Sequence, residues 1–339
     1  MNINYIYLDI TNKCNMNCLY CCKASESCIK CDIDMSLLYR ILNWAGLQGV
    51  KSITLSGGEP ALHNDFGLIL KKVKESYFES LRVMTNGFLF GLDLDIDVLD
   101  LIDEVCFSID TSIEENNKAI RTGFDNNTIR NINTFREKYP DIRLTIKSTI
   151  TTYNKKDIKS LINFSIKHGF SKITFGFCLP LGKAADINTY TKIRGEVSEL
   201  LAIQEYIARM KRRYNLLIEI VEPCVVFGCK LTDDNERFDL HIDENCNIYP
   251  CDGMNSSEYI VANIASDNFE KNIFENLNKI KSAIQKNNAK CSTCSISEKC
   301  KGSCLLYGES RNKGDADMFC EFRRLKTAKN NLVRFLSDV

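Results

Sequence analysis

The sequence has no excess of charge of either sign, no long hydrophobic run and very little histidine. Lys and Arg together number 44, as do Asp and Glu, so a basic surface that binds nucleic acid or an anionic membrane is not expected. No apolar run reaches the roughly 18 residues of a membrane span. Residues 1–13 lack the basic and long apolar segments of a signal peptide. These absences predict a cytoplasmic protein without nucleic-acid or membrane partners.

Cysteine, in contrast, is abundant, with 17 residues. Disulfides are not expected in a reducing compartment, so ligation of a metal or an iron–sulfur cluster is the better account of so many cysteines. The three histidines, His63, His168 and His241, are not spaced with cysteine as in a zinc finger, which excludes a Cys2His2 zinc site. The cysteines are therefore the main functional candidates.

Short β-rich runs alternate with amphipathic helical patterns through the first part of the chain. This alternation predicts an α/β fold with a parallel sheet and right-handed crossovers. The expected strands are residues 3–10, 52–57, 81–87, 104–110, 142–151 and 172–179, and the clearest expected helices are residues 34–47, 64–78, 155–169 and 196–214.

The character of the sequence changes after about residue 220. Cysteines crowd together, the connections look irregular, and one expected hairpin (residues 238–251) stands alone. This pattern predicts a second, small domain held together by metal. We therefore expect two domains, residues 1–220 and residues 221–339.

Three cysteines near the N-terminus, Cys14, Cys18 and Cys21, have the spacing C-x3-C-x2-C. Three thiolates from one loop can ligate three irons of a [4Fe–4S] cluster and leave the fourth iron open to bind another molecule. From the spacing alone, a zinc site that lacks one ligand, or buried unpaired thiols, is the alternative interpretation.

Further motifs follow the next three expected strands. They are "SGGEP" (residues 56–60), "TNG" (85–87) and "SID" (108–110). In parallel α/β barrels the chemistry gathers at the C-terminal ends of the strands, so these segments are expected to converge with the cysteines on one site. The glycines would let the backbone approach a ligand closely, and Glu59 would offer a carboxylate to an ammonium group.

With these motifs in register, residues 1–180 resemble the radical S-adenosylmethionine (SAM) enzymes. Their hallmark is C-x3-C-x2-C after the first strand of a partial (β/α)6 TIM-like barrel. The resemblance implies a [4Fe–4S] cluster on the three cysteines, with SAM chelating the open iron. One electron, from an external donor of the flavodoxin or ferredoxin type, would release a 5′-deoxyadenosyl radical that abstracts hydrogen from a substrate.

The resemblance also implies which residues contact SAM. Tyr20 matches the aromatic position near the adenine, and Ser108 and Arg121 match residues that contact the cofactor in the maturase subgroup. For Arg121 a surface position is the alternative. The motif that holds the methionine amino group is matched by Gly57, Gly58 and Glu59.

Eight downstream cysteines resemble the SPASM domain, a twin-cluster domain of radical enzymes that modify peptides and proteins. The motif C-x2-C-x5-C-x3-C spans residues 291–304, and "NIYPCDG" (247–253) matches the hairpin of that domain. The resemblance assigns Cys224, Cys229, Cys251 and Cys304 to auxiliary cluster I, and Cys291, Cys294, Cys300 and Cys320 to auxiliary cluster II. The cofactors would then be SAM and three [4Fe–4S] clusters.

Two departures from the family pattern affect auxiliary cluster I. The gap between Cys229 and Cys251 is longer than the family usually shows, and Cys246 stands where the family has a glycine. An open or differently ligated first auxiliary cluster is therefore one alternative. Two structural zinc sites are another, because four thiolates also suit zinc.

Cys178 and Asp252 are the candidate catalytic residues. Cys178 ends the sixth expected strand and could return a hydrogen atom to a substrate radical, as in peptide epimerases; packing is the alternative. Asp252 matches an aspartate that takes a substrate proton in sulfatase maturases, and hydrogen bonding around a cluster is its alternative. The other cysteines of the first half are expected to be free or buried thiols: Cys22, Cys28, Cys31 and Cys106.

The predicted function is a radical SAM enzyme that matures a ribosomally made peptide by crosslinking, epimerisation or oxidation. The alternatives are an anaerobic sulfatase maturase that forms formylglycine, a radical SAM enzyme for a small molecule, and a non-enzymatic electron-transfer or zinc-stabilised scaffold. An open iron argues against the scaffold. Because 13 residues precede Cys14, we expect a peptide to dock on the two domains themselves or to be delivered by a separate leader-peptide-binding protein.

Overall fold

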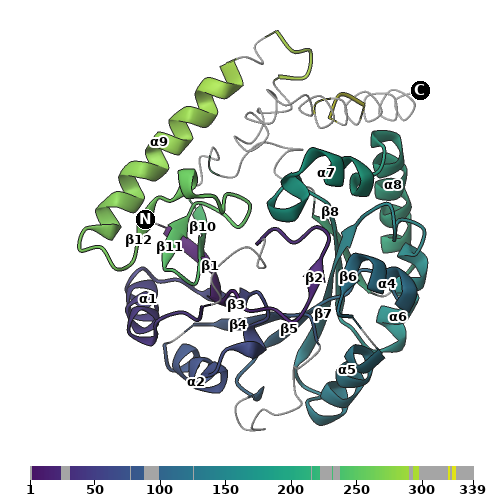
Figure 1. The fold of residues 1–339 in the computed structure, drawn as a ribbon, viewed down its shortest axis with the longest axis horizontal. Coiled ribbons are helices and arrows are strands. Elements are labelled where there is room, and N and C mark those ends of the chain that lie inside the picture. Colours follow the sequence, from purple (N-terminus) through teal and green to yellow (C-terminus); the bar gives the residue numbers. More distant parts are fainter. Residues whose placement is uncertain are drawn as a thin grey trace.

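A curved, largely parallel sheet forms the centre of the molecule (Figure 1). The structure is a computed structural model, and it describes residues 2–23, 31–76, 78–87, 99–124, 126–214, 216–221, 231, 237–289, 293–297, 320 and 323–325. In the described residues the main sheet has ten strands, in the order β12-β11-β10-β1-β3-β4-β5-β7-β8-β9. Their bounds are β1 (Asn2–Thr11), β3 (Ser52–Gly57), β4 (Ser80–Thr85), β5 (Glu104–Ser108), β7 (Arg143–Ile150), β8 (Lys172–Phe177), β9 (Leu217–Val221), β10 (Arg237–Ile242), β11 (Asn247–Tyr249) and β12 (Ala262–Asn263).

Helices connect the parallel strands and cover the convex side of the sheet, where Figure 1 shows α1, α2, α5 and α6. The α-helices are α1 (Met35–Leu47), α2 (Phe66–Glu75), α4 (Glu114–Ile120), α5 (Asn126–Lys138), α6 (Ile158–Lys167), α7 (Ile187–Arg194), α8 (Val197–Arg213) and α9 (Phe269–Ala289). Short 3-10 turns are η1 (Pro60–Leu62), η2 (Gly182–Ala185) and η4 (Ser257–Tyr259).

The expected α/β fold, a partial parallel (β/α)6 TIM-like barrel, is confirmed. Each of the six expected strands is present, as β1, β3, β4, β5, β7 and β8, and they pair in parallel. The four expected helices are α1, α2, α6 and α8. The strand β9 and the helices α4, α5, α7 and α9 were not expected from the sequence.

The two faces of the barrel strands differ in chemistry. On the outer face, which the helices cover, the side chains are aliphatic and buried, such as Leu55 of β3 and Val83 of β4. They form the core between the sheet and the helices. The inner face is polar. The hydroxyl of Tyr5 donates to Thr54 (2.6 Å), and that of Tyr7 donates to Ser56 (2.7 Å). The inside of the barrel is thus lined by hydrogen-bonding side chains rather than by an apolar core.

The hairpin expected at residues 238–251 does not stand alone, contrary to our expectation. It forms as β10 and β11, but β10 also pairs in parallel with β1, with Ile6 opposite Leu240 and Leu8 opposite Ile242. Leu240 and Ile242 are buried in the same core as the first-half strands. The hairpin therefore extends the barrel sheet and does not form a separate sheet.

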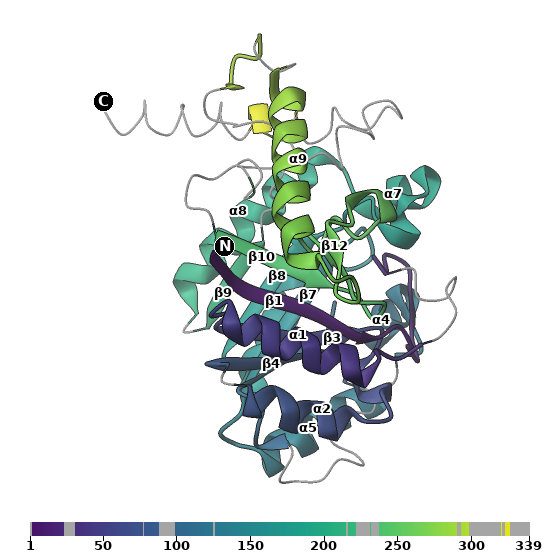
Figure 2. The same ribbon diagram turned by 90° about the vertical axis from the view of Figure 1, so that its left-hand side faces the viewer.

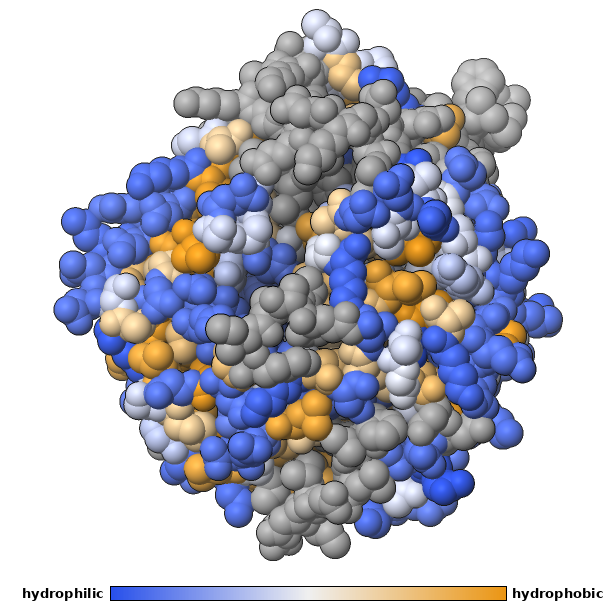
Figure 3. Space-filling view, in the orientation of Figure 1, coloured by the Kyte–Doolittle hydropathy of each residue, from blue (hydrophilic) through white to orange (hydrophobic). Residues whose placement is uncertain are grey.

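The long helix α9 stands beside this extension and projects past the sheet (Figure 2). Its first residue, Phe269, contacts the ring of Trp44 and lies under the guanidinium of Arg40 on α1, at 5.6 Å and 5.1 Å between centres. On the face in Figure 3, hydrophilic residues cover most of the periphery and hydrophobic ones gather in patches. Among the helices described, none combines the length and the apolar character needed to cross a bilayer.

Candidate functional site

The three N-terminal cysteines lie on a loop that follows β1, at the C-terminal end of the strand. Cys14, Cys18 and Cys21 are each partly exposed. A two-residue strand, β2 (Asn17–Cys18), fixes the middle of the loop by pairing with β6 (Arg121–Thr122). The structure therefore brings the cysteines to the edge of the barrel at which catalytic sites of this architecture lie.

Gly57 and Gly58 of the "SGGEP" motif pack directly against this cysteine loop. A Cβ on Gly57 would lie 2.0 Å from the carbonyl oxygen of Thr11, and one on Gly58 would lie 2.2 Å from that of Lys13. The backbone amides of Gly58 and Glu59 donate to the same two carbonyls, at 2.8 Å and 2.7 Å. We expected these glycines to approach a ligand; the close approach seen is to the backbone of the cysteine loop.

The carboxylate of Glu59 is fully buried and accepts hydrogen bonds from within the protein. Its donors are the amide of Asn86 (2.7 Å), the hydroxyl of Thr85 (2.7 Å) and the amide of Ala61 (3.3 Å). Burial raises the pKa of Glu59 to about 7, against the effect of these bonds. The side chain thus ties the motif after β3 to the "TNG" motif after β4.

Arg121 and Tyr20 belong to one buried network beside the cysteines. Arg121 is 7% exposed, which excludes the alternative of a surface residue. Its guanidinium binds Asp110 (2.6 Å) and the Tyr20 hydroxyl (2.6 Å), and lies 3.6 Å from the sulfur of Cys18. Tyr20 also donates to Asp110. The network joins the cysteine loop to the end of β5.

The donor chemistry of the cysteine loop suits an iron–sulfur cluster. The amide of Met16 donates to the sulfur of Cys14 (3.4 Å). Burial raises the pKa of Cys14 and raises that of Cys18 to about 11, so these thiols become thiolates when a metal supplies positive charge. The described residues hold no group of three His, Cys, Asp or Glu side chains arranged around one metal ion.

Lys147 is a candidate that the sequence analysis missed. It lies on β7 opposite Ser108 of β5, and its side chain is partly exposed. Along β7 it alternates with the buried core residues Leu144 and Ile146, so it lies on the inner face of the strand. No hydrogen bond or ion pair of its side chain is found within the described residues. The position within the strand carried no sequence signal, because a single lysine in a β-rich run is common.

The two candidate catalytic residues differ in position and in exposure. Cys178 directly follows β8 and is 4% exposed. Burial, and then the charge of Asp110, raises the pKa of Cys178 to about 12, so it stays a thiol. Asp252 is exposed, and its charge acts on Tyr5, Tyr7 and Lys23.

Only part of the second cysteine group falls within the described residues. Cys251, Cys294 and Cys320 are described and partly exposed. The other predicted ligands, Cys224, Cys229, Cys291, Cys300 and Cys304, lie outside the described residues, as does Cys28. Cys246 is buried and has φ of 63°, a left-handed conformation that favours glycine. That conformation agrees with the position at which the SPASM family has a glycine.

The fold and the residues at its strand ends define a partial parallel barrel that carries a cysteine loop. Residues 8–165, just under half of the chain, match the model of the radical SAM superfamily, the family that the cysteine motif resembles. One relative, "GTP 3′,8-cyclase" of Clostridium perfringens (strain SM101 / Type A), is 28% identical over 59% of this chain. The match spans 62% of that relative's length.

Solved structures resemble a larger share of the chain. Streptococcus suis SuiB bound to S-adenosylmethionine matches 92% of this chain and 74% of its own, with a TM-score of 0.71 and 18% identity. Native anSMEcpe with bound AdoMet and the Cp18Cys peptide matches all of both chains, with a TM-score of 0.70 and 17% identity. At this identity the likeness shows the fold, and it includes the second half.

Proposed function

We propose that this protein is a radical SAM enzyme that abstracts a hydrogen atom from a peptide or protein substrate. The observation that carries the proposal is the placement of Cys14, Cys18 and Cys21 at the C-terminal end of β1, beside the polar inside of the barrel. Possible outcomes on a ribosomally made peptide are crosslinking, epimerisation and oxidation, and formylglycine formation is the alternative for a sulfatase substrate.

The three cysteines would ligate a [4Fe–4S] cluster, and the polypeptide around them would bind SAM. When bound, the cluster takes an electron from an external donor and supplies it for the cleavage of SAM to a 5′-deoxyadenosyl radical. Tyr20, held by Asp110 and Arg121, would face the adenine. The carboxylate of Glu59 is already satisfied, so backbone groups of the "GGEP" motif would receive the methionine amino group.

Ser108 and Lys147 would hold the methionine carboxylate. Their positions are opposite each other on β5 and β7. The guanidinium of Arg121 is occupied by Asp110 and Tyr20, whereas the ammonium of Lys147 has no partner in the described residues. Arg121 would therefore act by orienting the cysteine loop rather than by binding the carboxylate.

Two further side chains would act on the substrate. Cys178 would return a hydrogen atom to a substrate radical, because a buried thiol that keeps its proton can serve as a hydrogen-atom donor. Asp252, which is exposed, would take a proton. Eight further cysteines would hold two auxiliary clusters, in a second domain with its boundary near residue 220.

A second candidate function is a radical reaction on a nucleotide. Relatives in sequence bear the name GTP 3′,8-cyclase, whereas the solved structures alike in fold include enzymes bound to peptides. The peptide proposal is preferred because the likeness to those structures extends over 92–100% of the chain, while the match to the first two relatives covers 59% and 64%.

The first test is the iron and acid-labile sulfide content after anaerobic reconstitution. Three clusters correspond to about 12 iron atoms per chain, falling to about 8 in the variant Cys14→Ala/Cys18→Ala/Cys21→Ala. About 4 iron atoms that vanish in this variant, with zinc present, would remove the auxiliary clusters from the proposal. Cleavage of SAM to 5′-deoxyadenosine by the reduced protein then tests the radical chemistry.

The second test separates the substrates. The reduced enzyme is incubated with SAM and either GTP or a library of peptides, and the products are analysed by mass spectrometry. Peptide products that lose two hydrogens, or gain one deuterium in heavy water, support the peptide proposal. Conversion of GTP with no change in any peptide would establish the second candidate instead.

A further inference from the structure

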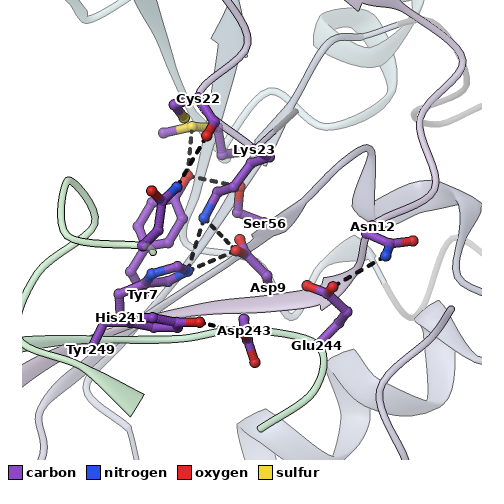
Figure 4. Close-up of polar contacts among 12 residues, drawn as sticks. Tyr7, Asp9, Asn12, Cys22, Lys23, Ser56, His241, Asp243, Glu244 and Tyr249 are labelled. Carbon is purple, nitrogen blue, oxygen red and sulfur yellow. Dashed lines mark hydrogen bonds and ion pairs between the residues drawn. The ribbon is translucent and has the colours of Figure 1, made fainter. Parts of the chain in front are cut away.

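A buried ionic cluster lies where the cysteine loop meets the inner face of the barrel (Figure 4). Lys23, two residues after Cys21, forms an ion pair with Asp9 of β1. The ammonium of Lys23 lies 2.8 Å from Nε2 of His241 on β10, and that nitrogen lies 2.7 Å from Oδ2 of Asp9. Asp9 and His241 are each 1% exposed. Three segments far apart in the sequence thus meet at one point.

Aromatic rings hold His241 in place. Its ring stacks on that of Tyr249, with centres 5.3 Å apart, and meets the edge of Tyr7 at 5.8 Å. The Tyr249 hydroxyl donates to Asp243 (2.9 Å), which fixes the stacking partner. Lys23 lies 5.5 Å above the ring of Tyr7, a cation–π contact. The position of Lys23 is therefore determined from several sides.

Stability does not explain this cluster. A buried ion pair contributes little net stability, because desolvation of the charges offsets their attraction. Two buried atoms, Oδ1 of Asp9 and Nδ1 of His241, also have no hydrogen-bond partner within the described residues. A partly satisfied polar network is less stable than an apolar one of the same shape. The arrangement therefore points to a purpose other than holding the fold together.

We propose that Lys23 is a positioning residue that, through Asp9 and His241, fixes the end of the cysteine loop to β1 and β10. The inference rests on the proposed function, in which Cys21 ligates the first cluster. The main chain supports it: the carbonyl of Cys21 accepts from the amide of Lys183 (2.9 Å), and that of Cys22 accepts from Asn255 (3.1 Å).

The consequence is a mechanical link between the two halves of the chain. β10 belongs to the hairpin that leads to Cys251, and Asn255 follows it by four residues. A displacement of this hairpin would move His241 and Asn255, and with them the loop that carries Cys21. The second half thus sets the geometry of the first cluster without contributing a ligand to it.

The test compares Lys23→Met, which removes the ammonium, with Lys23→Arg, which keeps a charge able to reach both partners. The readout is the affinity for SAM, measured from the SAM-dependent change in the electron paramagnetic resonance spectrum of the reduced first cluster. We expect Lys23→Met to weaken SAM binding about tenfold or more, as for other residues that orient metal ligands. Lys23→Arg is expected to retain most of the affinity.

A double variant separates positioning from stability. Lys23→Met alone leaves the buried carboxylate of Asp9 without the lysine charge and with only His241 beside it, whereas Asp9→Asn/Lys23→Met removes both charges. We expect the double variant to recover the unfolding temperature of the wild type but not its SAM affinity. Recovery of both would overturn the proposal, since Lys23 would then only neutralise Asp9.

Two further variants test the partners. His241→Phe keeps the ring contacts and removes the nitrogen, and it should weaken SAM binding in the same direction; an unchanged affinity would overturn the link to β10. The matched control is Lys13→Met, in the same loop, whose lysine pairs with the more exposed Asp32 and is expected to change little. A wild type that binds no iron would refute the proposed function, whereas a loaded Lys23→Met with unchanged affinity would refute this inference alone.

Discussion

At the scale of single residues, Gly58 packs closely against the backbone of the cysteine loop. In Gly58→Ala the added Cβ would lie 2.2 Å from the Lys13 carbonyl oxygen and 2.8 Å from that of Asn12, both rigid backbone atoms. We expect the variant to lose about 2 kcal/mol of folding free energy and to retain less iron after reconstitution. Chemical denaturation and iron analysis check this prediction.

The matched control for that substitution is Gly176→Ala, in the barrel strand β8. No atom lies within 4 Å of a Cβ at this position. Its free energy of unfolding is expected to stay within about 0.5 kcal/mol of the wild type. If the two variants had the same free energy of unfolding, the backbone of the cysteine loop could move away from the "SGGEP" motif with little loss of stability.

Glu59 gives the stability a defined dependence on pH. Its pKa is raised by burial from 4.5 to about 7, so between these values the folded protein binds more protons than the unfolded chain. The free energy of unfolding therefore falls as pH rises through this window, by about 3 kcal/mol in total, and no further above it. The measurement is urea denaturation of the iron-free wild type and Glu59→Gln from pH 5 to 8. A difference between the two that does not change with pH would contradict the raised pKa.

At the scale of elements, we expect alanine substitutions at two glycines near helix ends to change the stability in opposite directions. Gly46 lies in α1, where an added Cβ would make only an ordinary contact of 3.8 Å with the Ser76 carbonyl oxygen, so Gly46→Ala should stabilise the protein by about 0.5–1 kcal/mol. Gly169 follows α6 with φ of +68°, so Gly169→Ala should destabilise it by about 1 kcal/mol. Thermal unfolding of both variants checks the signs. Two shifts of the same sign would contradict the assigned helix ends.

The elements also show how far sequence reasoning reached. Local periodicity sufficed for the six parallel strands and for α1, α2, α6 and α8, because each buries a stripe set by its own residues. The pairing of β10 with β1 could not be predicted, since neither short strand carries a signal for a partner more than 200 residues away. The same holds for contacts between segments in the site. The spacing of the cysteines predicted the cysteine loop, but no pattern in the neighbouring sequence predicted that Arg121 would be buried against Asp110.

The roles of the site residues remain predictions, for a physical reason. Some of the residues that resemble SAM contacts already form hydrogen bonds within the protein. Glu59 accepts from the amide of Asn86, and Arg121 donates to Asp110. These hydrogen bonds depend on burial and on partners from distant strands, which cannot be read from composition or from the spacing of residues. Lys147 illustrates the converse, because its position opposite Ser108 becomes visible only in the register of β5 and β7.

At the scale of the whole molecule, the sheet crosses the boundary near residue 220 that the cysteine distribution predicted. β10 covers an edge of β1 and brings His241 against Asp9, so a chain ending at residue 221 would lose the partner strand and expose the edge. The lost contacts should exceed about 5 kcal/mol, the lower range of a domain's total stability. We expect residues 1–221 to show no cooperative thermal transition in circular dichroism. Residues 1–289, which keep β10–β12 and α9, serve as the control and should unfold cooperatively. If both fragments show the same cooperative transition, residues 1–221 fold on their own. β10 would then not be required for the barrel to fold.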